Sequence, residues 1–183
     1  MLKKILASAA IFSLWGCTSL VPSTLVRLNA LDPFTADPND MAVALELPAG
    51  LALQAGSTQM MFKAVHSPSG EAHQREYVLR EQRMPDGLVI YTLSPEDIEN
   101  LEAMKVSLLP WKETSDGNSS LSMGVIADAC RVPGIEVPAD PRVTILLRLE
   151  ADGPLRPLVR DASILEYFDV ADLAELPQCS GPF

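Results

Sequence analysis

The sequence predicts a mainly β fold: an antiparallel β-sandwich or a partly open barrel, with one helix near residues 94–105. Three observations favour this class. About nine short segments show the alternating or β-branched pattern that is typical of strands. Turns rich in Pro, Gly and Asp separate these segments. The 15 prolines fit loops and edge strands better than a mainly helical fold. Because no internal repeat or linker divides the chain, we expect residues 24–183 to form a single domain.

The first half of the domain is expected to contain five strands. Residues 24–31 alternate in character and predict the first one. A turn-rich loop should follow, because proline restricts φ and Asp or Asn side chains bond local amides. Turn signals such as Ser-Pro-Ser-Gly and Pro-Asp-Gly then separate the remaining predicted strands, which are residues 41–47, 58–65, 75–80 and 88–93.

One helix has a clear start. Ser94 is a favourable N-cap, and Pro95 suits the first helical position. Glu96 and Asp97 favour the positive end of the helix dipole. Because Ile98 and Leu101 share a face, we expect this helix to cover one end or face of the sheet and to end near residue 105.

The second half returns to strand-like segments. Residues 142–150 are rich in Val, Ile and Leu and give the clearest strand signal in the chain. Residues 163–168 suit either a strand or a short helix, and residues 169–176 are weakly helical. The other strands predicted here are residues 106–112, 121–132 and 155–160.

The N-terminus resembles a secretion signal. Lys3 and Lys4 make a basic start without acids, and an apolar stretch follows over residues 5–15. This stretch is too short for a membrane-spanning helix, which needs about 20 residues. A short apolar run behind a basic start is typical of a signal peptide.

The end of that segment, Leu14-Trp15-Gly16-Cys17, resembles the lipobox of bacterial lipoproteins, although Trp15 departs from the usual small or aliphatic residue. The resemblance implies that residues 1–16 are removed, that the Cys17 sulfur carries a diacylglycerol, and that residues 17–23 form a lipidated tether. Two or three acyl chains would hold the protein on a membrane almost permanently. The residue after the cysteine is Thr18 and not Asp, which favours the periplasmic face of the outer membrane. The alternative is an ordinary signal peptide with a chance cysteine.

Composition excludes several classes of function. The chain has 24 acidic and 14 basic residues and a net charge of −10. Loss of a signal peptide with two lysines would make the charge about −12. Such a chain repels nucleic acid and anionic lipid surfaces. A hydrophobic fraction of 48% also excludes a disordered chain and suffices for a core.

Two cysteines remain besides Cys17. In an oxidising compartment we expect Cys130 and Cys179 to form a disulfide, and the alternative is two unpaired thiols. The chain-entropy model gives such a bridge about 4 kcal/mol of stabilisation. It would also hold the C-terminal tail, which would otherwise fray.

The two histidines offer a weak metal-binding hypothesis. His66 and His73 could join Met60 and Met61 in a site for a soft metal. These four residues are not spaced as closely as a compact metal site requires. We therefore favour the interpretation that both histidines flank a turn and face water. Met60 and Met61 point to opposite faces of a strand, so at most one of them faces the core. We therefore expect no metal and no cofactor.

No catalytic motif stands out. Neither Gly-x-Ser-x-Gly nor His-Glu-x-x-His occurs, and the acidic residues between 96 and 102 fit a solvated helix face. Trp111 could be an exposed anchor for a partner, but a core aromatic is favoured because aromatic residues make up 5% of the chain. We therefore expect no enzymatic activity and no catalytic residues.

These observations predict an envelope lipoprotein whose domain binds or scaffolds another envelope component, most simply a protein. Two alternatives stay open. A carrier of a small ligand or lipid would have a deep apolar cavity between its sheets. A hydrolase would have a cleft with converging polar groups. A scaffold predicts a filled core and an exposed apolar or acidic patch.

Overall fold

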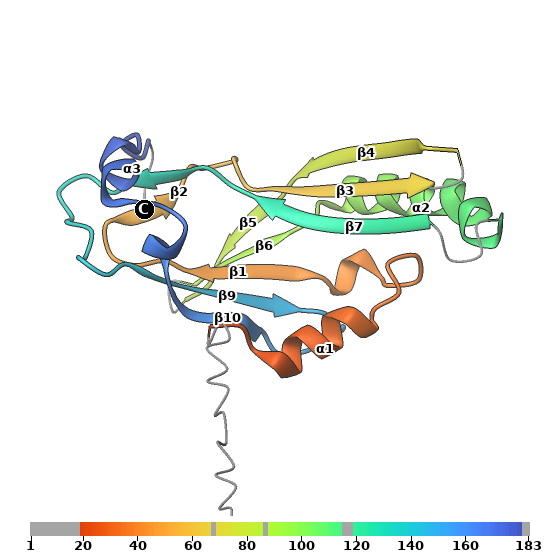
Figure 1. The fold of residues 1–183 in the computed structure, drawn as a ribbon, viewed down its shortest axis with the longest axis horizontal. Helices are drawn as coiled ribbons and strands as arrows, with labels where there is room; N and C mark the ends of the chain where they lie inside the picture. The colour runs from red at the N-terminus through yellow and green to blue at the C-terminus, as the bar shows by residue number, and fades with distance from the viewer. Residues whose placement is uncertain (1–18, 67–68, 86–87, 115–118, 181–183) are drawn as a thin grey trace, which may run out of the picture.

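The mainly β prediction is confirmed by the computed structural model (Figure 1), which describes residues 19–66, 69–85, 88–114 and 119–180, and in 112–114 and 119 the backbone alone. Its ten strands form three antiparallel sheets in a sandwich-like arrangement, and none of these described sheets closes into a barrel. The helices are α1 (Pro22–Ala30), α2 (Pro95–Thr114) and α3 (Val170–Glu175), with short 3₁₀ turns at η1 (Pro38–Asp40) and η2 (Ile164–Glu166).

Five strands form the largest sheet, in the spatial order β10-β9-β1-β6-β5. Strand β1 pairs with β6 on one side and β9 on the other. Its side chains alternate between two apolar clusters: Ala42 and Ala44 are buried with Ile90, whereas Leu45 packs against the main core. These strands are β1 (Ala42–Glu46), β5 (Arg80–Arg83), β6 (Val89–Thr92), β9 (Arg142–Arg148) and β10 (Arg156–Ser163).

Two smaller sheets complete the β structure. One has the order β4-β3-β7, and the other pairs β2 with β8 close to α3 (Figure 1). Their strands are β2 (Leu51–Leu53), β3 (Gln59–His66), β4 (Glu71–Val78), β7 (Ser119–Ile126) and β8 (Ala129–Arg131).

The main core lies between the three-stranded sheet, α2 and β6. Phe62 of β3 and Leu101 and Leu108 of α2 are almost completely buried there. Burying each such side chain stabilises the fold by roughly 1.5–3 kcal/mol. Met60 is buried beside them and Met61 is half-buried, so the expectation that at most one of the two faces the core is confirmed.

Most predicted strands are present with small changes at their ends. The segments 41–47, 58–65, 88–93, 142–150 and 155–160 correspond to β1, β3, β6, β9 and β10. The expected long strand 121–132 is split into β7 and β8, and the segment 75–80 is divided between β4 and β5. The segment 163–168, for which a strand and a short helix were both considered, contains η2, and the weakly helical segment 169–176 contains α3. The short strand β2 was not predicted.

The start of α2 agrees with the prediction. The Ser94 hydroxyl accepts a hydrogen bond from the Asp97 backbone N–H at 3.1 Å and donates to the Asp97 carboxylate at 2.7 Å. This is a capping interaction at the N-terminus of the helix, with acidic residues in its first turn.

The end of α2 does not agree, because the predicted strand 106–112 is helical. Leu108 and Trp111 continue the helical spacing of Leu101 and pack on the same core. Pro110 lies inside the helix. An internal proline costs roughly 3 kcal/mol, and burial of the neighbouring apolar residues offsets this cost.

The predicted strand 24–31 is also wrong, because residues 24–30 belong to α1. Pro22 starts this helix, and Thr24 is its buried residue. The Thr24 hydroxyl donates to the Pro157 carbonyl of β10 at 2.7 Å. Half-buried Leu28, four residues further on, lies on the same side of the helix. The contact of this side of α1 with β10 therefore favours a helix over the predicted strand.

The outer edge of β10 is already occupied by the residues before α1. The Val21 N–H donates to the Leu158 carbonyl at 2.9 Å, and the Arg160 N–H donates to the Ser19 carbonyl at 2.7 Å. Leu20 forms an isolated bridge with Val159. The chain is thus bound to the sheet from residue 19 onward.

Candidate binding surface around helix α3

Helix α3 is six residues long and is defined by its cap. The Asp169 carboxylate accepts from the Asp172 N–H at 2.8 Å, and the Asp172 carboxylate accepts from the Asp169 N–H at 2.9 Å. Leu173 is the residue that this helix buries. A helix this short is marginal alone, so its position depends on the contacts that hold the chain on either side of it.

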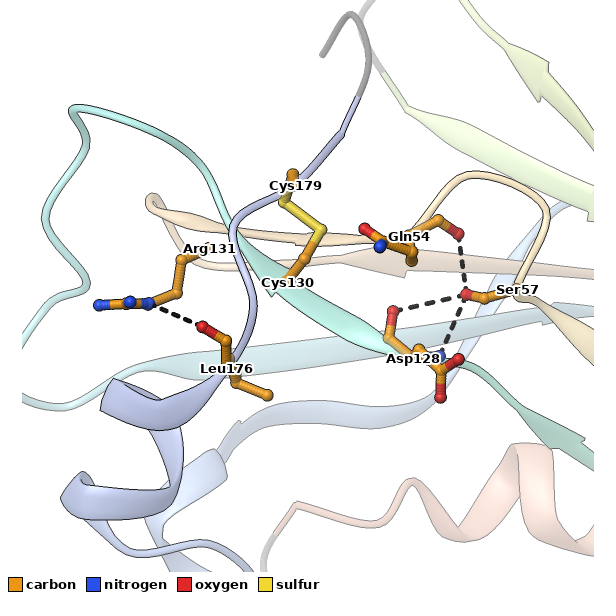
Figure 2. Close-up of a disulfide and its surroundings, with 7 residues drawn as sticks. All are labelled: Gln54, Ser57, Asp128, Cys130, Arg131, Leu176 and Cys179. Atoms are coloured by element: carbon orange, nitrogen blue, oxygen red, sulfur yellow. Dashed lines mark hydrogen bonds between the residues drawn. A yellow bond between two sulfur atoms is a disulfide. The ribbon is translucent and has the colours of Figure 1, made fainter.

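The disulfide Cys130–Cys179 provides the strongest of these contacts (Figure 2). It joins β8 to the tail after α3 with a Cα–Cα distance of 4.9 Å, and both cysteines are buried. The predicted bridge is therefore confirmed. It removes entropy from the unfolded chain and places the tail against β8.

Hydrogen bonds from Arg131 hold the same tail. Its N–H donates to the Pro177 carbonyl at 2.8 Å, and its carbonyl accepts from the Cys179 N–H at 2.9 Å. Its guanidinium Nε donates to the Leu176 carbonyl at 3.1 Å (Figure 2). The tail therefore occupies the edge of β8 that would otherwise be open.

A second group of contacts orders the opposite end of β8 (Figure 2). The Ser57 hydroxyl donates to the Gln54 carbonyl at 2.8 Å and accepts from the Asp128 N–H at 3.1 Å. The Gln54 N–H donates to the Asp128 carbonyl at 2.8 Å. Strand β8, and with it the base of the α3 region, is thus held at both ends.

Two open apolar grooves flank α3 and share Leu173 as a common wall. The first has a volume of about 510 Å³ and lies toward the loop 132–141, with the lining residues Ile135, Val137, Pro138, Leu165 and Val170. The second has a volume of about 690 Å³ and lies toward β2, β8 and β9, with the lining residues Leu51, Ala129, Val143, Phe168 and Leu176. We call the helix and its two grooves the α3 surface.

Large apolar side chains are exposed along this surface and just before α3 in the chain. Tyr167 is 73% exposed, Val170 is 69% exposed, Phe168 is 54% exposed and Ile135 is 51% exposed. Single exposed apolar residues are ordinary, but a group of them beside apolar grooves is typical of an interaction site. Aromatic residues are also enriched among the residues that contribute most to interfaces.

Acidic residues surround the grooves. The two segments that border them, 132–141 and 164–180, contain no Lys, Arg or His. Glu136 lines the first groove, and Asp172 and Glu175 line the second. All the acids of these two segments are exposed, namely Glu136, Asp140, Glu166, Asp169, Asp172 and Glu175.

The nearest arginine on the β9 side does not offset this charge, because its own acidic partners neutralise it. Arg142 contacts the Asp140 carboxylate at 2.8 Å and that of Asp161 at 3.5 Å. Hydrogen bonds from Ser163 and then from Arg142 hold the pKa of Asp140 below its ordinary value. The Asp140 carboxylate therefore stays ionised and paired with Arg142, and the negative charge of the rim comes from other acids, such as Glu136 and Glu175.

The histidines and the tryptophan meet elsewhere, at the far end of β3 and β4. The His66 ring stacks on Trp111 with centroids 5.2 Å apart, and the His73 ring lies tilted at the same distance. The His66 Nε2 is buried without a hydrogen-bond partner in the described structure. The expectation that both histidines face water is thus wrong for His66. Half-buried Trp111 packs against the core, as favoured.

This arrangement does not gather the set of ligands considered for a metal. Met60 is a core residue, and Met61 points to the other face of β3. The described residues contain no group of three His, Cys, Asp or Glu side chains that could hold an ion.

A more polar hollow of about 520 Å³ lies between β4 and α2, lined in part by His73 and Ser107. His73 contacts the Glu71 carboxylate at 3.1 Å. The Ser107 hydroxyl donates to the Met104 carbonyl at 2.7 Å, so its proton is engaged by the helix backbone and not by a base. This geometry does not activate a nucleophile.

Comparisons of the chain with protein-family models, with curated proteins and with solved structures find no match. Within the described part of the chain, no helix is long and apolar enough to cross a membrane. Cys17, the expected lipid attachment site, lies outside the described residues.

Sequence reasoning did not identify the α3 surface. It brings together β2, β8, β9 and a C-terminal helix that are distant in the chain. One local signal was available: residues 164–180 combine a Tyr-Phe pair with acids and no basic residue. The second signal was the cysteine pair, because a bridge at Cys179 implies that the preceding helix has a defined position.

Proposed function

We propose that this protein is a lipid-anchored bacterial envelope protein whose domain binds another envelope protein through the α3 surface, without catalysing a reaction. The observation that carries the proposal is the group of exposed apolar side chains that line the two grooves, namely Ile135, Phe168 and Val170. The Cys130–Cys179 bridge holds the chain beside them in place. The lipobox-like sequence at Cys17 supports the anchor.

The path of the chain near residue 19 supports a domain held close to the membrane. Ser19 is already hydrogen-bonded to β10, so Thr18 alone separates Cys17 from the sheet. In Figure 1 the red start of the described chain lies beside β10, and α3 lies at the opposite side of the molecule. With Cys17 lipidated on the periplasmic face of the outer membrane, the α3 surface would point away from the lipid.

The shape of the grooves favours a protein partner over a carried lipid. A carrier needs an enclosed cavity that covers most of its ligand. Here the grooves are open, and the main core is filled by residues such as Phe62 and Leu108. Open apolar grooves with exposed aromatic residues fit the surface of another protein.

In-cell photo-cross-linking tests the proposal. A photoreactive amino acid at Ala174, which lines the first groove, should give a discrete protein adduct in intact cells. The same amino acid at Val106, which is exposed on α2, serves as the matched control and should not give that adduct. The proposal fails if Ala174 gives no adduct, or if both positions give the same one.

A further inference from the structure

We infer that the α3 surface takes a basic amphipathic helix as its partner, with the apolar face of that helix in the grooves and its Lys or Arg residues on the acidic rim. This inference rests on the proposed function and specifies the chemistry of the partner. Three features of the surface carry it: its charge, the occupied edges of β8 and β10, and its shape.

The charge of the rim determines which partner fits. Residues 132–141 and 164–180 supply six acids and no base around two apolar grooves. Two arginines lie close to these acids. Arg142 is paired with Asp140 and Asp161, and Arg131, which lines the first groove, donates its Nε to the Leu176 carbonyl. The acids still outnumber these two bases. An acidic partner would be repelled, whereas a partner with basic residues beside an apolar stripe would complement both features.

The backbone around the grooves favours a helix over an extended segment. An added strand needs an open sheet edge. Pro177 and Cys179 occupy the edge of β8, and residues 19–21 occupy the edge of β10. The edge strand that remains at the second groove is β2, which is three residues long and offers few backbone groups to an added strand. A helix satisfies its own backbone hydrogen bonds, so it can bind in a groove that is lined by side chains.

The same charge argues against direct insertion into a membrane. Cytoplasmic and bacterial lipid surfaces are commonly anionic, and an acidic rim is repelled by them. The grooves are also divided by α3, which is about 9 Å long at 1.5 Å per residue. A partner helix can contact α3 along its length and place side chains on both sides of it.

A synthetic peptide of known chemistry provides the probe. The peptide has about 14 residues and is about 21 Å long as a helix, with Leu on one face, Lys on the other and one photoreactive Leu. The full lipidated protein is presented in zwitterionic lipid nanodiscs. Ultraviolet cross-linking followed by peptide mapping should place the adducts in residues 132–141 and 164–180. A matched peptide with Glu in place of Lys should give adducts at least tenfold less efficiently.

Charge reversal on the protein gives the second arm. Glu136→Lys with Glu175→Lys should weaken cross-linking of the Lys peptide by about tenfold or more, because attraction at the rim becomes repulsion. Lys at position 175 suits the last turn of α3, so this variant should still fold. The control variant, Glu76→Lys with Glu99→Lys, makes the same change in net charge at exposed positions on β4 and α2. It should leave cross-linking within about twofold of the wild type.

The outcomes separate this inference from the proposed function. Equal cross-linking by the Lys and Glu peptides, or an equal loss in both charge variants, would overturn the helix inference. So would labelling of residues 164–180 by a photoreactive lipid in place of the peptide. If Ala174 gives a protein adduct in cells while the Lys peptide does not bind, the proposed function stands and the partner has another chemistry.

Discussion

At the scale of single residues, Thr24 explains why the first segment is a helix. Its hydroxyl is buried against β10 and donates to the Pro157 carbonyl at 2.7 Å. A sequence pattern of alternating character could not reveal this contact, because its partner lies 133 positions away. The local signal for a helix was Pro22, which suits a first helical position.

Thr24→Val is therefore expected to destabilise the protein. The substitution keeps the shape of the side chain but leaves the Pro157 carbonyl without its donor, at a cost of about 1–3 kcal/mol. Urea denaturation should show this loss as a lower free energy of unfolding. Ser23→Ala, at the exposed neighbouring position in α1, is the control and should change stability by less than about 0.5 kcal/mol. Equal stability of both variants would contradict the role of this hydrogen bond.

Other single residues were predictable to different degrees. Ser94 and Asp97 predicted the start of α2 because a cap depends on neighbours in the chain. His66 was not placed correctly, since its position depends on a ring contact with Trp111, a residue on another element. The acids of α3 were visible in the sequence, but their position beside apolar grooves was not.

At the scale of elements, the strands were more predictable than the helix boundaries. Strands such as β1 and β9 alternate or are rich in β-branched residues, so their sequences show them directly. The second half of α2 was predicted as a strand, and Val106 and Pro110 do disfavour a helix locally. Tertiary contacts of Leu108 with the core outweigh that local preference.

The Cys130–Cys179 bridge is the element-scale contact with the largest expected effect. Replacing both cysteines by Ala should lower the free energy of unfolding by about 4 kcal/mol, the value of the chain-entropy model for a separation of 49 residues. Urea denaturation measures this loss. Wild-type protein treated with a reductant should unfold at the same urea concentration as the double variant. A variant as stable as the oxidised wild type would show that the bridge does not hold the tail.

At the scale of the whole molecule, the mainly β class was predictable and the arrangement of the sheets was not. The order β10-β9-β1-β6-β5 joins strands from both halves of the chain. Such non-local pairings depend on side chains that meet after folding, and a single sequence does not display them. The α3 surface is also non-local, because it combines α3 with loop 132–141 and with β2, β8 and β9.

The short segment between Cys17 and β10 affects the position of the whole molecule. Residues 19–21 are bonded to β10, so an anchor at Cys17 would hold the domain at the lipid surface. This geometry makes the anchor central to the account. A lipidated Cys17 would place the disulfide in an oxidising compartment and would limit the partners that can reach α3 to those of the envelope.

Intact-mass and N-terminal analysis of the protein extracted from membranes of its host tests this claim most directly. If Cys17 is the anchor, the mature chain begins at Cys17, carries a diacylglycerol on the sulfur, and loses this lipid in a Cys17→Ser variant. Two or more acyl chains would explain stable membrane retention. A chain that keeps residues 1–16, or one whose Cys17 carries no lipid, would contradict the account.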